Sequence, residues 1–505
     1  MLGRRQLLGR AAALAATQFL AGGLHARPAG TRARALVDPF ALGVASGEPS
    51  HDGFLLWTRI AGLTEDRLVG YEIAQDENFR RIVRRGRETA PLARGGAVHL
   101  EVRGLAAGRR YFYRFHHGDA VSRTGTVATI AAAPDRVRLA LTSCQHWEHG
   151  WFTAYRDMIA NGVDAVLQVG DYIYERSFGP GPDVRSFGAR DPRTLDEYRA
   201  RHALYRSDAD LAAAHAAMPF LVSWDDHEVE NDYFADRAGY TGDPQAFVRR
   251  RAAAYRAYFE HMPLRPSALR RDGSVRLYRS IVWGDLAAAH ILDTRQYRTP
   301  SACVADGSAG DVPVAQCAGS AKDGGSMLGK AQEAWFGKAA VAHPVRWSLV
   351  TQQTFFSRLV LPGGPDALHP QFWDGYPAAR ARLLDALAAA NTRNAVILGG
   401  DVHSFWINDV KRDFADPSAP TVATEIVTSC LASRNGPRAL FDPAPQLNPH
   451  VRFRDNSHAG YVLLDITRER IEGLLRAVTD LADPASDCRT LHSFVMMDGR
   501  SGVMP

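Results

Sequence analysis

Two short apolar runs, separated by a stretch with helical spacing, place the strongest constraint on the fold. Leu139–Thr142 and Ala165–Val169 each have the length of a buried strand. The order strand, helix, strand predicts a parallel pair joined by a right-handed crossover. Functional groups in such sheets lie at the carboxyl ends of the strands. Cys144, Asp171 and Tyr174 should therefore meet at one edge of a sheet.

The pattern divides the chain into two parts after the N-terminus. Residues 36–135 contain short alternating runs separated by turn residues, such as Gly53–Arg59 and Tyr111–Phe115, which is typical of a β-sandwich. About 100 residues suits a fibronectin type III-like domain. We predict the boundary near Ala131–Asp135 and a second domain over 136–505. A chain of 505 residues is too long for one ordinary core.

From Arg136 onward the pattern changes to α/β. Strands are predicted over Val137–Thr142, Ala165–Val169, Pro219–Ser223, Ser280–Trp283, Ala287–Leu292, Trp347–Thr351, Asn394–Gly399, Thr421–Thr428 and Tyr461–Ile466. Helices are predicted over Trp151–Asn161, Thr194–Arg206, Asp208–Ala216, Pro244–Tyr258, Gly329–Ala342 and Pro377–Ala390. Asp208 is expected to cap its helix. Residues after about Asp483 have no readable role.

Residues 1–35 have the layout of an export signal rather than of structure. Arg4 and Arg5 open the segment, and Ala11–Gly23 is apolar but too short to span a bilayer comfortably. The adjacent arginines indicate the bacterial twin-arginine export machinery, with a plain secretory signal as the alternative. Cleavage after Ala35 would fit a small-residue site. No other apolar stretch could form a transmembrane segment, so the mature protein is expected to be soluble.

The charge of the chain depends on that signal. Residues 1–35 hold six arginines and no acidic residue, so the 60 basic residues fall to 54 without them, against 55 acidic residues. A nearly neutral body gives no support to a stable nucleic-acid partner.

Five cysteines are an odd number for an exported chain. Cys303 and Cys317 flank a loop rich in small residues and form an easy disulfide pair, and Cys430 could pair with Cys488. Cys144 is left over, and either burial in the core or metal ligation would account for it.

Residues that can bind a metal follow several predicted strands. They are Cys144, Asp171, Tyr174, Asp226, His227, Asp401 and His403, with Gln352 and Gln353 after a further strand. A thiolate, a carboxylate and a phenolate on one centre suit Fe³⁺, whereas Ca²⁺ prefers carboxylate and amide oxygens. Two such ions, with Asp171 as the bridge, would clamp a phosphate ester. Each motif alone also fits a turn, a cap or a core residue, so the hypothesis depends on their joint placement.

Asp171-x-x-Tyr174, Asp226-His227-Glu228 and Asp401-x-His403 resemble the signature of the calcineurin-like metallophosphoesterases. The pattern is most similar to the PhoD-like alkaline phosphatase/phosphodiesterase family. The resemblance implies an α/β (α+β) chain, with an N-terminal β-sandwich and a metallophosphoesterase αββα core. It also implies a periplasmic or secreted hydrolase of phosphate mono- or diesters that acts by attack of a metal-activated hydroxide.

The resemblance also implies roles for individual residues. Fe³⁺ would be held by Cys144, Asp171, Tyr174 and His403, and Ca²⁺ by Asp171, Asp226 and Asp401, with Gln352 or Gln353 completing that site. Asn231 would contact the phosphate, and His227 would help to protonate the leaving group. Cys144, Asp226 and Asp401 depart from the general metallophosphoesterase pattern in the same way as the PhoD-like family.

Other residues near these motifs allow both a functional and a structural interpretation. Arg201 and Arg206 could reach the phosphate, with a solvated or salt-bridged helix as the more common explanation for such residues. His146, Trp147 and His149 would line either the pocket or a surface loop, and Asp293–Tyr297 is expected to be structural.

Two alternative functions stay open at the level of sequence. A phospholipase D-like phosphodiesterase would need a wide pocket mouth with apolar walls. A catalytically inactive protein that binds a cell-wall polymer or a partner would keep the fold without the chemistry. The preferred ester and the oligomeric state are not encoded in the motif spacing.

Overall fold

The computed structural model describes residues 38–179, 183–239, 242–301, 312–313, 325–362 and 367–504. The predicted signal and the predicted Cys303–Cys317 disulfide lie outside these residues. Asp38–Pro505 form one compact unit. Among the described residues, no helix has the length and apolarity needed to cross a membrane.

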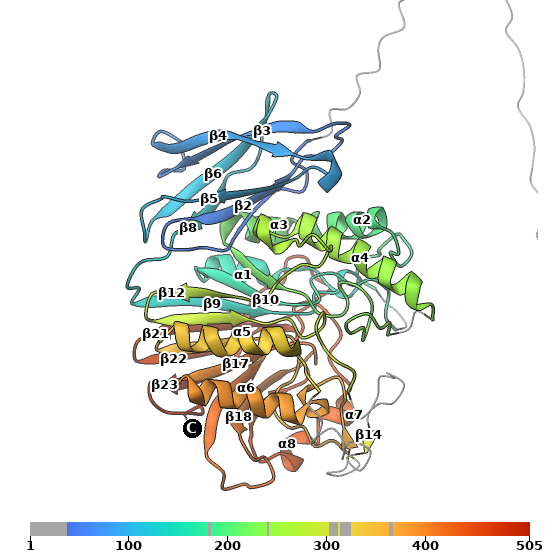
Figure 1. Cartoon of the computed structure of the whole chain (residues 1–505), viewed down its shortest axis with the longest axis vertical. Coiled ribbons are helices and arrows are strands. Elements are labelled where there is room, and N and C mark those ends of the chain that lie inside the picture. The colour runs from blue at the N-terminus through green and yellow to red at the C-terminus, as the bar shows by residue number, and fades with distance from the viewer. Residues whose placement is uncertain are drawn as a thin grey trace, which may run out of the picture. The chain divides into compact units, whose positions relative to one another are not determined.

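The N-terminal part of this unit consists of two antiparallel sheets (Figure 1). The first contains β1 Val44–Gly47, β2 Phe54–Arg59 and β5 Ala97–Val102; the second contains β3 Arg67–Ala74, β4 Ile82–Ala90, β6 Arg110–His117, β7 Ala120–Val121 and β8 Gly125–Ala128. Alternate residues of β6 are buried, so that Tyr111, Tyr113 and Phe115 share one core with Phe54 and Leu56. The expected all-β organisation is observed, and the fibronectin type III-like class stays a prediction.

Two larger sheets follow in the chain. The six-stranded sheet has the order β11-β10-β9-β21-β22-β23, with β9 Arg136–Thr142, β10 Ala165–Val169, β11 Phe220–Ser223, β21 Gly460–Thr467, β22 Arg470–Val478 and β23 Cys488–Met497. The seven-stranded sheet has the order β12-β13-β15-β17-β19-β18-β20, with β12 Arg279–Trp283, β13 Ala287–Ile291, β15 Trp347–Thr351, β17 Ala395–Gly399, β18 Phe405–Lys411, β19 Thr421–Val427 and β20 Val451–Asp455. The predicted parallel pairing of β9 with β10 is confirmed, and β10 is also parallel to β11.

The described helices are α1 Ala154–Ala160, α2 Leu195–Arg206, α3 Ala209–Ala217, α4 Pro244–His261, α5 Gly329–Ala342, α6 Pro377–Ala389, α7 Arg438–Phe441 and α8 Ala444–Leu447. Single turns of 3₁₀-helix occur at Leu92–Arg94, Trp147–His149, Pro266–Ala268 and Trp373–Gly375. A two-stranded ribbon pairs β14 Val312–Pro313 with β16 Ala367–Leu368. Asp208 caps α3 as expected, because its carboxylate accepts from the main-chain N–H groups of Asp210 and Leu211.

Alternating side chains of the buried strands separate the layers. Leu139 and Leu167 face the core between the two large sheets, whereas Ala140 and Val166 face the core shared with α1 to α4. The outer face of the seven-stranded sheet packs against α5 and α6 through another cluster that includes Phe336. The layers are therefore helices, sheet, sheet and helices, in agreement with the expected αββα core.

The C-terminal third differs most from the sequence-based expectation. The sequence did not predict β18, β20, β22 or β23. The segment after Asp483 contains β23, which is an edge strand of the six-stranded sheet. β22 and β23 have one half-exposed face, which weakens the apolar pattern on which prediction depends. β18 is buried, but Asn408 and Asp409 interrupt its apolar run.

The predicted Cys430–Cys488 disulfide is wrong, because both cysteines are free. Cys430 bonds through its carbonyl to Gly460 at the start of β21, whereas Cys488 pairs with Val478 on β22. Two cysteines need Cα atoms about 4.4–6.8 Å apart to form a disulfide. Cys430 lies beside β21 and Cys488 lies on β23, so β22 separates them.

Acid should destabilise this fold through its buried neutral histidines. Burial lowers the pKa of His99 to about 4 and that of His202 to about 3. In the unfolded chain these histidines have a pKa of about 6.5, so below that pH they bind protons in the unfolded state but not in the folded state. The free energy of unfolding should therefore fall as the pH drops from about 6.5 to about 4, by at most about 1.4 kcal/mol per pH unit for each histidine.

Urea unfolding at several pH values would measure this slope. His202→Phe keeps a ring stacked on His261, 4.9 Å away between centroids, and should make the slope shallower. An unchanged slope in that variant would exclude His202 as a source of the acid sensitivity.

Candidate metal centre and active site

The predicted ligands gather where parallel strands of both large sheets end. Cys144 follows β9, Asp171 follows β10, and Asp401 and His403 follow β17. All four residues have positive φ, of 57°, 54°, 70° and 54° respectively. Residues with a Cβ adopt this region at a cost and mostly where the surrounding structure enforces it. The strand ends are therefore shaped by a constraint other than local backbone preference.

Two glycines let the strand ends approach one another. A Cβ on Gly170 would lie 2.4 Å from the Cβ of Asp225, and one on Gly400 would lie 2.3 Å from the Oγ of Ser143. Gly170 also has a φ of 115°, which residues with side chains rarely adopt. These positions bring the ends of β9, β10, β11 and β17 into contact.

The carboxylate of Asp171 forms a cluster with three further groups that can bind a metal. Its Oδ2 lies 3.3 Å from the Sγ of Cys144 and 3.1 Å from the hydroxyl of Tyr174. The same hydroxyl lies 3.0 Å from Nε2 of His403. His403 Nδ1 lies 2.6 Å from the carbonyl oxygen of Arg434, so Nδ1 carries the proton and the lone pair of Nε2 faces the cluster. The hydroxyl of Tyr174 has one proton for two acceptors, Oδ2 of Asp171 and Nε2 of His403. One of these two atoms therefore keeps a lone pair that can bind a metal.

Burial opposes ionisation of this cluster. It raises the pKa of Asp171 to about 7, and it raises the pKa values of Cys144 and Tyr174 well above their ordinary ranges, with the nearby Asp171 charge adding to both shifts. A thiol, a phenol and a carboxylic acid in contact become anionic together only when a cation compensates them.

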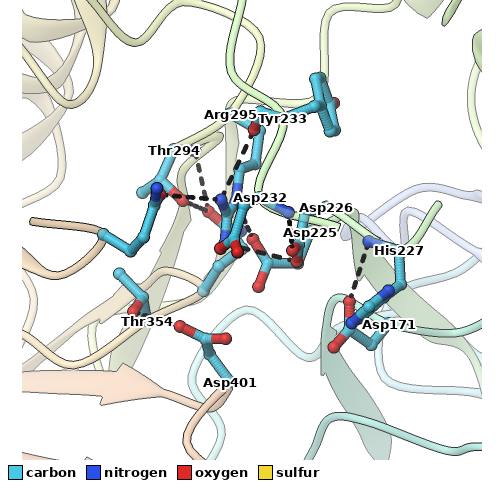
Figure 2. Close-up of polar contacts among 12 residues, drawn as sticks. Asp171, Asp225, Asp226, His227, Asp232, Tyr233, Thr294, Arg295, Thr354 and Asp401 are labelled. Carbon is cyan, nitrogen blue, oxygen red and sulfur yellow. Dashed lines mark hydrogen bonds and ion pairs between the residues drawn. The ribbon is translucent and has the colours of Figure 1, made fainter. Parts of the chain in front are cut away.

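A second cluster is formed by Asp225, Asp226 and Asp401, each of which offers an oxygen within 4.8 Å of the others (Figure 2). The guanidinium of Arg295 binds Asp225 Oδ1 at 2.5 Å and lies 3.3 Å from Asp226 Oδ1. That Asp226 oxygen has no hydrogen bond within the described chain. Burial raises the pKa of Asp225 well above its usual range, whereas Arg295 and His227 overcome burial at Asp226 and lower its pKa to about 2.

Arg295 and Glu228 were not assigned to the site from the sequence. The sequence predicts only structural hydrogen bonding for Arg295. The fold shows that its guanidinium reaches the carboxylates of Asp225 and Asp226, which follow β11. The carboxylate of Glu228 accepts from the main-chain N–H groups of Asp225 at 2.7 Å, Asp171 at 3.0 Å and Tyr172 at 2.5 Å. Glu228 therefore ties the loop after β10 to the loop after β11. The position of Glu228 directly after His227 in the motif was the one sequence signal that it belongs to the site.

A cavity of about 340 Å³ opens beside the first cluster and is lined by His146, His149, Tyr174, Phe178, Gly179, His227, Asn231, His403, Ser433 and Arg434. Within it, His227 Nδ1 lies 2.7 Å from the carboxylate of Glu175, while its main-chain N–H donates to Asp171 (Figure 2). Burial alone would lower the pKa of His227, but the carboxylates of Glu175, Asp171 and Asp226 raise it well above its ordinary value.

Several other predicted residues lie away from this cavity. Arg201 donates to the carbonyl oxygens of Tyr174 and Arg190 and lies 3.7 Å over the ring of Phe187, so it supports the loop that carries Tyr174. Its substrate contact stays a prediction without geometric support. Arg206 is fully buried over Trp57. Trp147 is not among the lining residues, although His146 and His149 are.

The two glutamines use their amide oxygens elsewhere. Oε1 of Gln352 accepts from Thr354 N and Trp373 Nε1, both at 3.0 Å. Oε1 of Gln353 accepts from the N–H and hydroxyl of Thr294 at 2.8 and 2.7 Å. An amide oxygen accepts two hydrogen bonds, so neither has a lone pair left for Ca²⁺. The expectation that one of them ligates a metal disagrees with this structure.

Comparisons with known proteins agree with this geometry. Residues 139–475 match the family model described as PhoD-like phosphatase, and residues 25–131 match that of its N-terminal domain. Alkaline phosphatase D of Bacillus subtilis (strain 168) is 39% identical over 487 residues, which cover 92% of this chain and 82% of the relative.

Solved structures give the same result. A structure of PhoD matches with a TM-score of 0.86 and 36% identity, covering 92% of both chains. A purple acid phosphatase from seeds of yellow lupin (Lupinus luteus) has a TM-score of 0.57 at 11% identity, covers 90% of this chain and 73% of its own, and shares the fold. The resemblance read from the motifs is thus confirmed: this chain belongs to the PhoD-like phosphatase family.

Proposed function

We propose that this protein is an exported, metal-dependent phosphoric ester hydrolase of the alkaline phosphatase/phosphodiesterase type. The observation that carries the proposal is the convergence of Cys144, Asp171, Tyr174 and His403 on one point, beside the carboxylates of the second cluster. Family membership supports the reaction class. The paired arginines Arg4 and Arg5 support export by the twin-arginine route to the periplasm or the medium.

The donor atoms fit two different cations. Thiolate, phenolate, carboxylate and imidazole donors suit Fe³⁺, which Cys144, Asp171, Tyr174 and His403 would hold. The second cluster offers only oxygens, which suit Ca²⁺, with Asp226 and Asp401 as ligands and Asp171 as the bridge. When bound, such ions act as Lewis acids that polarise a phosphate ester and lower the pKa of water.

The residues of the cavity can serve the same reaction. Glu175 fixes the ring of His227 through Nδ1, so Nε2 is free to donate a proton to the departing oxygen of the substrate. Asn231 lines the same cavity, and its main-chain N–H donates to Glu175. Its side-chain amide donates one proton to Asp232 at 2.6 Å, so the second amide proton can go to a phosphate oxygen. Phe178 is the one purely apolar side chain among the residues that line this cavity, so the cavity gives no support to the phospholipase D-like alternative, which needs a wide mouth with apolar walls.

Removal and return of metals would test the proposal. Purified protein should contain about one iron per chain and should hydrolyse mono- and bis-nitrophenyl phosphate, and chelation should abolish both activities until iron and calcium are returned. The ratio of the two rates would rank monoesters against diesters. Zinc or manganese in place of iron would contradict the metal assignment, and an inactive protein that is insensitive to chelators would contradict the function and favour the binding protein.

Replacement of His227 should reveal its role through the leaving group. With an alkyl phosphate, whose alkoxide needs a proton, His227→Asn should lower kcat by about 10²- to 10⁴-fold. With nitrophenyl phosphate, whose leaving group departs as a stable anion, the loss should be much smaller. His117→Asn, at the end of β6, is the matched control. Equal losses with both substrates would show that His227 is not the proton donor.

A further inference from the structure

A groove of about 940 Å³ runs beside the free edge of the seven-stranded sheet. The end strand is β12, whose Ser280, Ile281 and Val282 line the groove. Trp335 and Lys338 of α5 form part of the opposite wall. No residue of the candidate metal clusters lines this groove, so it is a separate feature of the surface.

The groove is strongly basic. Its cationic lining residues are Arg265, Arg270, Arg276, Arg279 and Lys338, and its one carboxylate is Glu48. Glu48 pairs with Arg279 and lies 3.7 Å from Arg265. Within the described chain, Arg270 and Lys338 are exposed without an ion pair. The guanidinium of Arg276 lies 4.4 Å from the ring centroid of Tyr278 and also lacks a carboxylate partner. Arg270, Arg276 and Lys338 thus form no ion pair within the described chain, and Asp272 is the one carboxylate whose charge interacts with that of Arg270.

The groove also offers an unpaired strand edge above an apolar floor. No hydrogen bond joins the outward main-chain groups of β12 to another segment of the described chain. The floor includes Ile130, Leu264, Ile281 and Ala339. An exposed edge strand is a template for another extended chain, and main-chain bonds to it are directional.

We propose that this groove binds an extended acidic segment of a partner polypeptide, which adds to β12 as a further strand. Alternate apolar side chains of the segment lie on the floor, and its carboxylates face Arg270, Arg276 and Lys338. A second copy of β12 does not fit, because it would bring the same arginines together. A polymer of phosphates would satisfy the charges but leave the strand edge and the apolar floor unused. Residues 1–35 carry six arginines and no acidic residue, so this N-terminal segment has the wrong charge.

The experiment uses the whole protein and a display library of peptides about eight residues long, the usual length of a paired strand. Selected peptides should alternate apolar and acidic residues. Arg270→Glu/Lys338→Glu should weaken binding of a selected peptide by about tenfold or more in fluorescence anisotropy. Arg412→Glu/Lys330→Glu changes the same charge at exposed positions outside the groove and should change binding by less than about twofold.

A second readout separates strand addition from simple charge attraction. N-methylation of the selected peptide's main chain removes its donors and should also weaken binding about tenfold or more. The bound peptide should slow amide hydrogen exchange in β12. No enrichment of peptides, equal binding to the charge-reversed variant, or equal binding of the N-methylated peptide would overturn the proposal. Tighter binding of inorganic polyphosphate than of any peptide would reassign the groove to a phosphate polymer. Phosphatase activity should be unchanged in both double variants.

Discussion

Asp171→Ala should remove the proposed iron and the phosphatase activity together. One carboxylate oxygen of Asp171 contacts both Cys144 and Tyr174, and the other accepts from the main-chain N–H of His227. A carboxylate oxygen of Asp171 also lies within 4.8 Å of one of Asp226, so Asp171 joins the first cluster to the second. Loss of the bridge should cost several kcal/mol of transition-state stabilisation, or about 10³-fold or more in kcat/KM. Elemental analysis and hydrolysis of nitrophenyl phosphate on the same preparation would measure both quantities.

The stability of the chelated protein separates this effect from misfolding. Burial raises the pKa of Asp171 to about 7, so its ionised form is disfavoured in the folded state without a cation. Asp171→Asn, which keeps the shape of the side chain, should therefore leave Tm of the chelated protein unchanged or higher. Asp119→Asn, in an exposed turn, is the matched control and should keep metal and activity. An Asp171→Ala protein that kept its iron and turned over substrate would exclude the bridging role.

Arg295→Leu should destabilise the protein by about 3–5 kcal/mol, because it leaves two buried carboxylates without their cation. The side chains of Arg295, Asp225 and Asp226 are 1%, 2% and 5% exposed, so solvent screens these charges little. Arg412→Leu breaks an exposed ion pair with Asp385 and should cost at most about 1 kcal/mol. Urea unfolding of the chelated proteins would compare the two variants.

Calcium should restore part of the stability that Arg295→Leu loses. A cation bound by the folded protein alone stabilises it, and the variant presents the same carboxylates with one positive charge fewer. Addition of Ca²⁺ should therefore raise Tm of Arg295→Leu more than Tm of the wild-type protein. Arg295→Lys should be intermediate, since an ammonium group cannot reproduce the forked contact with both carboxylates. A loss no larger than that of Arg412→Leu would show that the Arg295 bridge contributes nothing to stability.

Local patterns predicted the buried strands well. The predicted bounds of Ala165–Val169 and Trp347–Thr351 agree with β10 and β15, because both strands are buried throughout and mainly apolar. The cap at Asp208 was readable for a similar reason, since capping depends on neighbouring residues alone. Half-exposed strands such as β22 and β23 gave no comparable signal.

The sequence by itself determined which donors follow which strands, and hence that Cys144, Asp171 and Tyr174 share one edge of a parallel sheet. His403 follows β17 of the other large sheet, and the family resemblance assigned it to the same site. The parallel strand order made that inference possible, because donors that follow such strands meet wherever the strands pair. Only the tertiary structure decided that Arg295 neutralises the carboxylates after β11, that Gln352 and Gln353 bond elsewhere, and that Cys430 and Cys488 stay apart. These contacts join residues distant in the chain, and spacing along a sequence carries no information about which of many compatible partners a long side chain will meet.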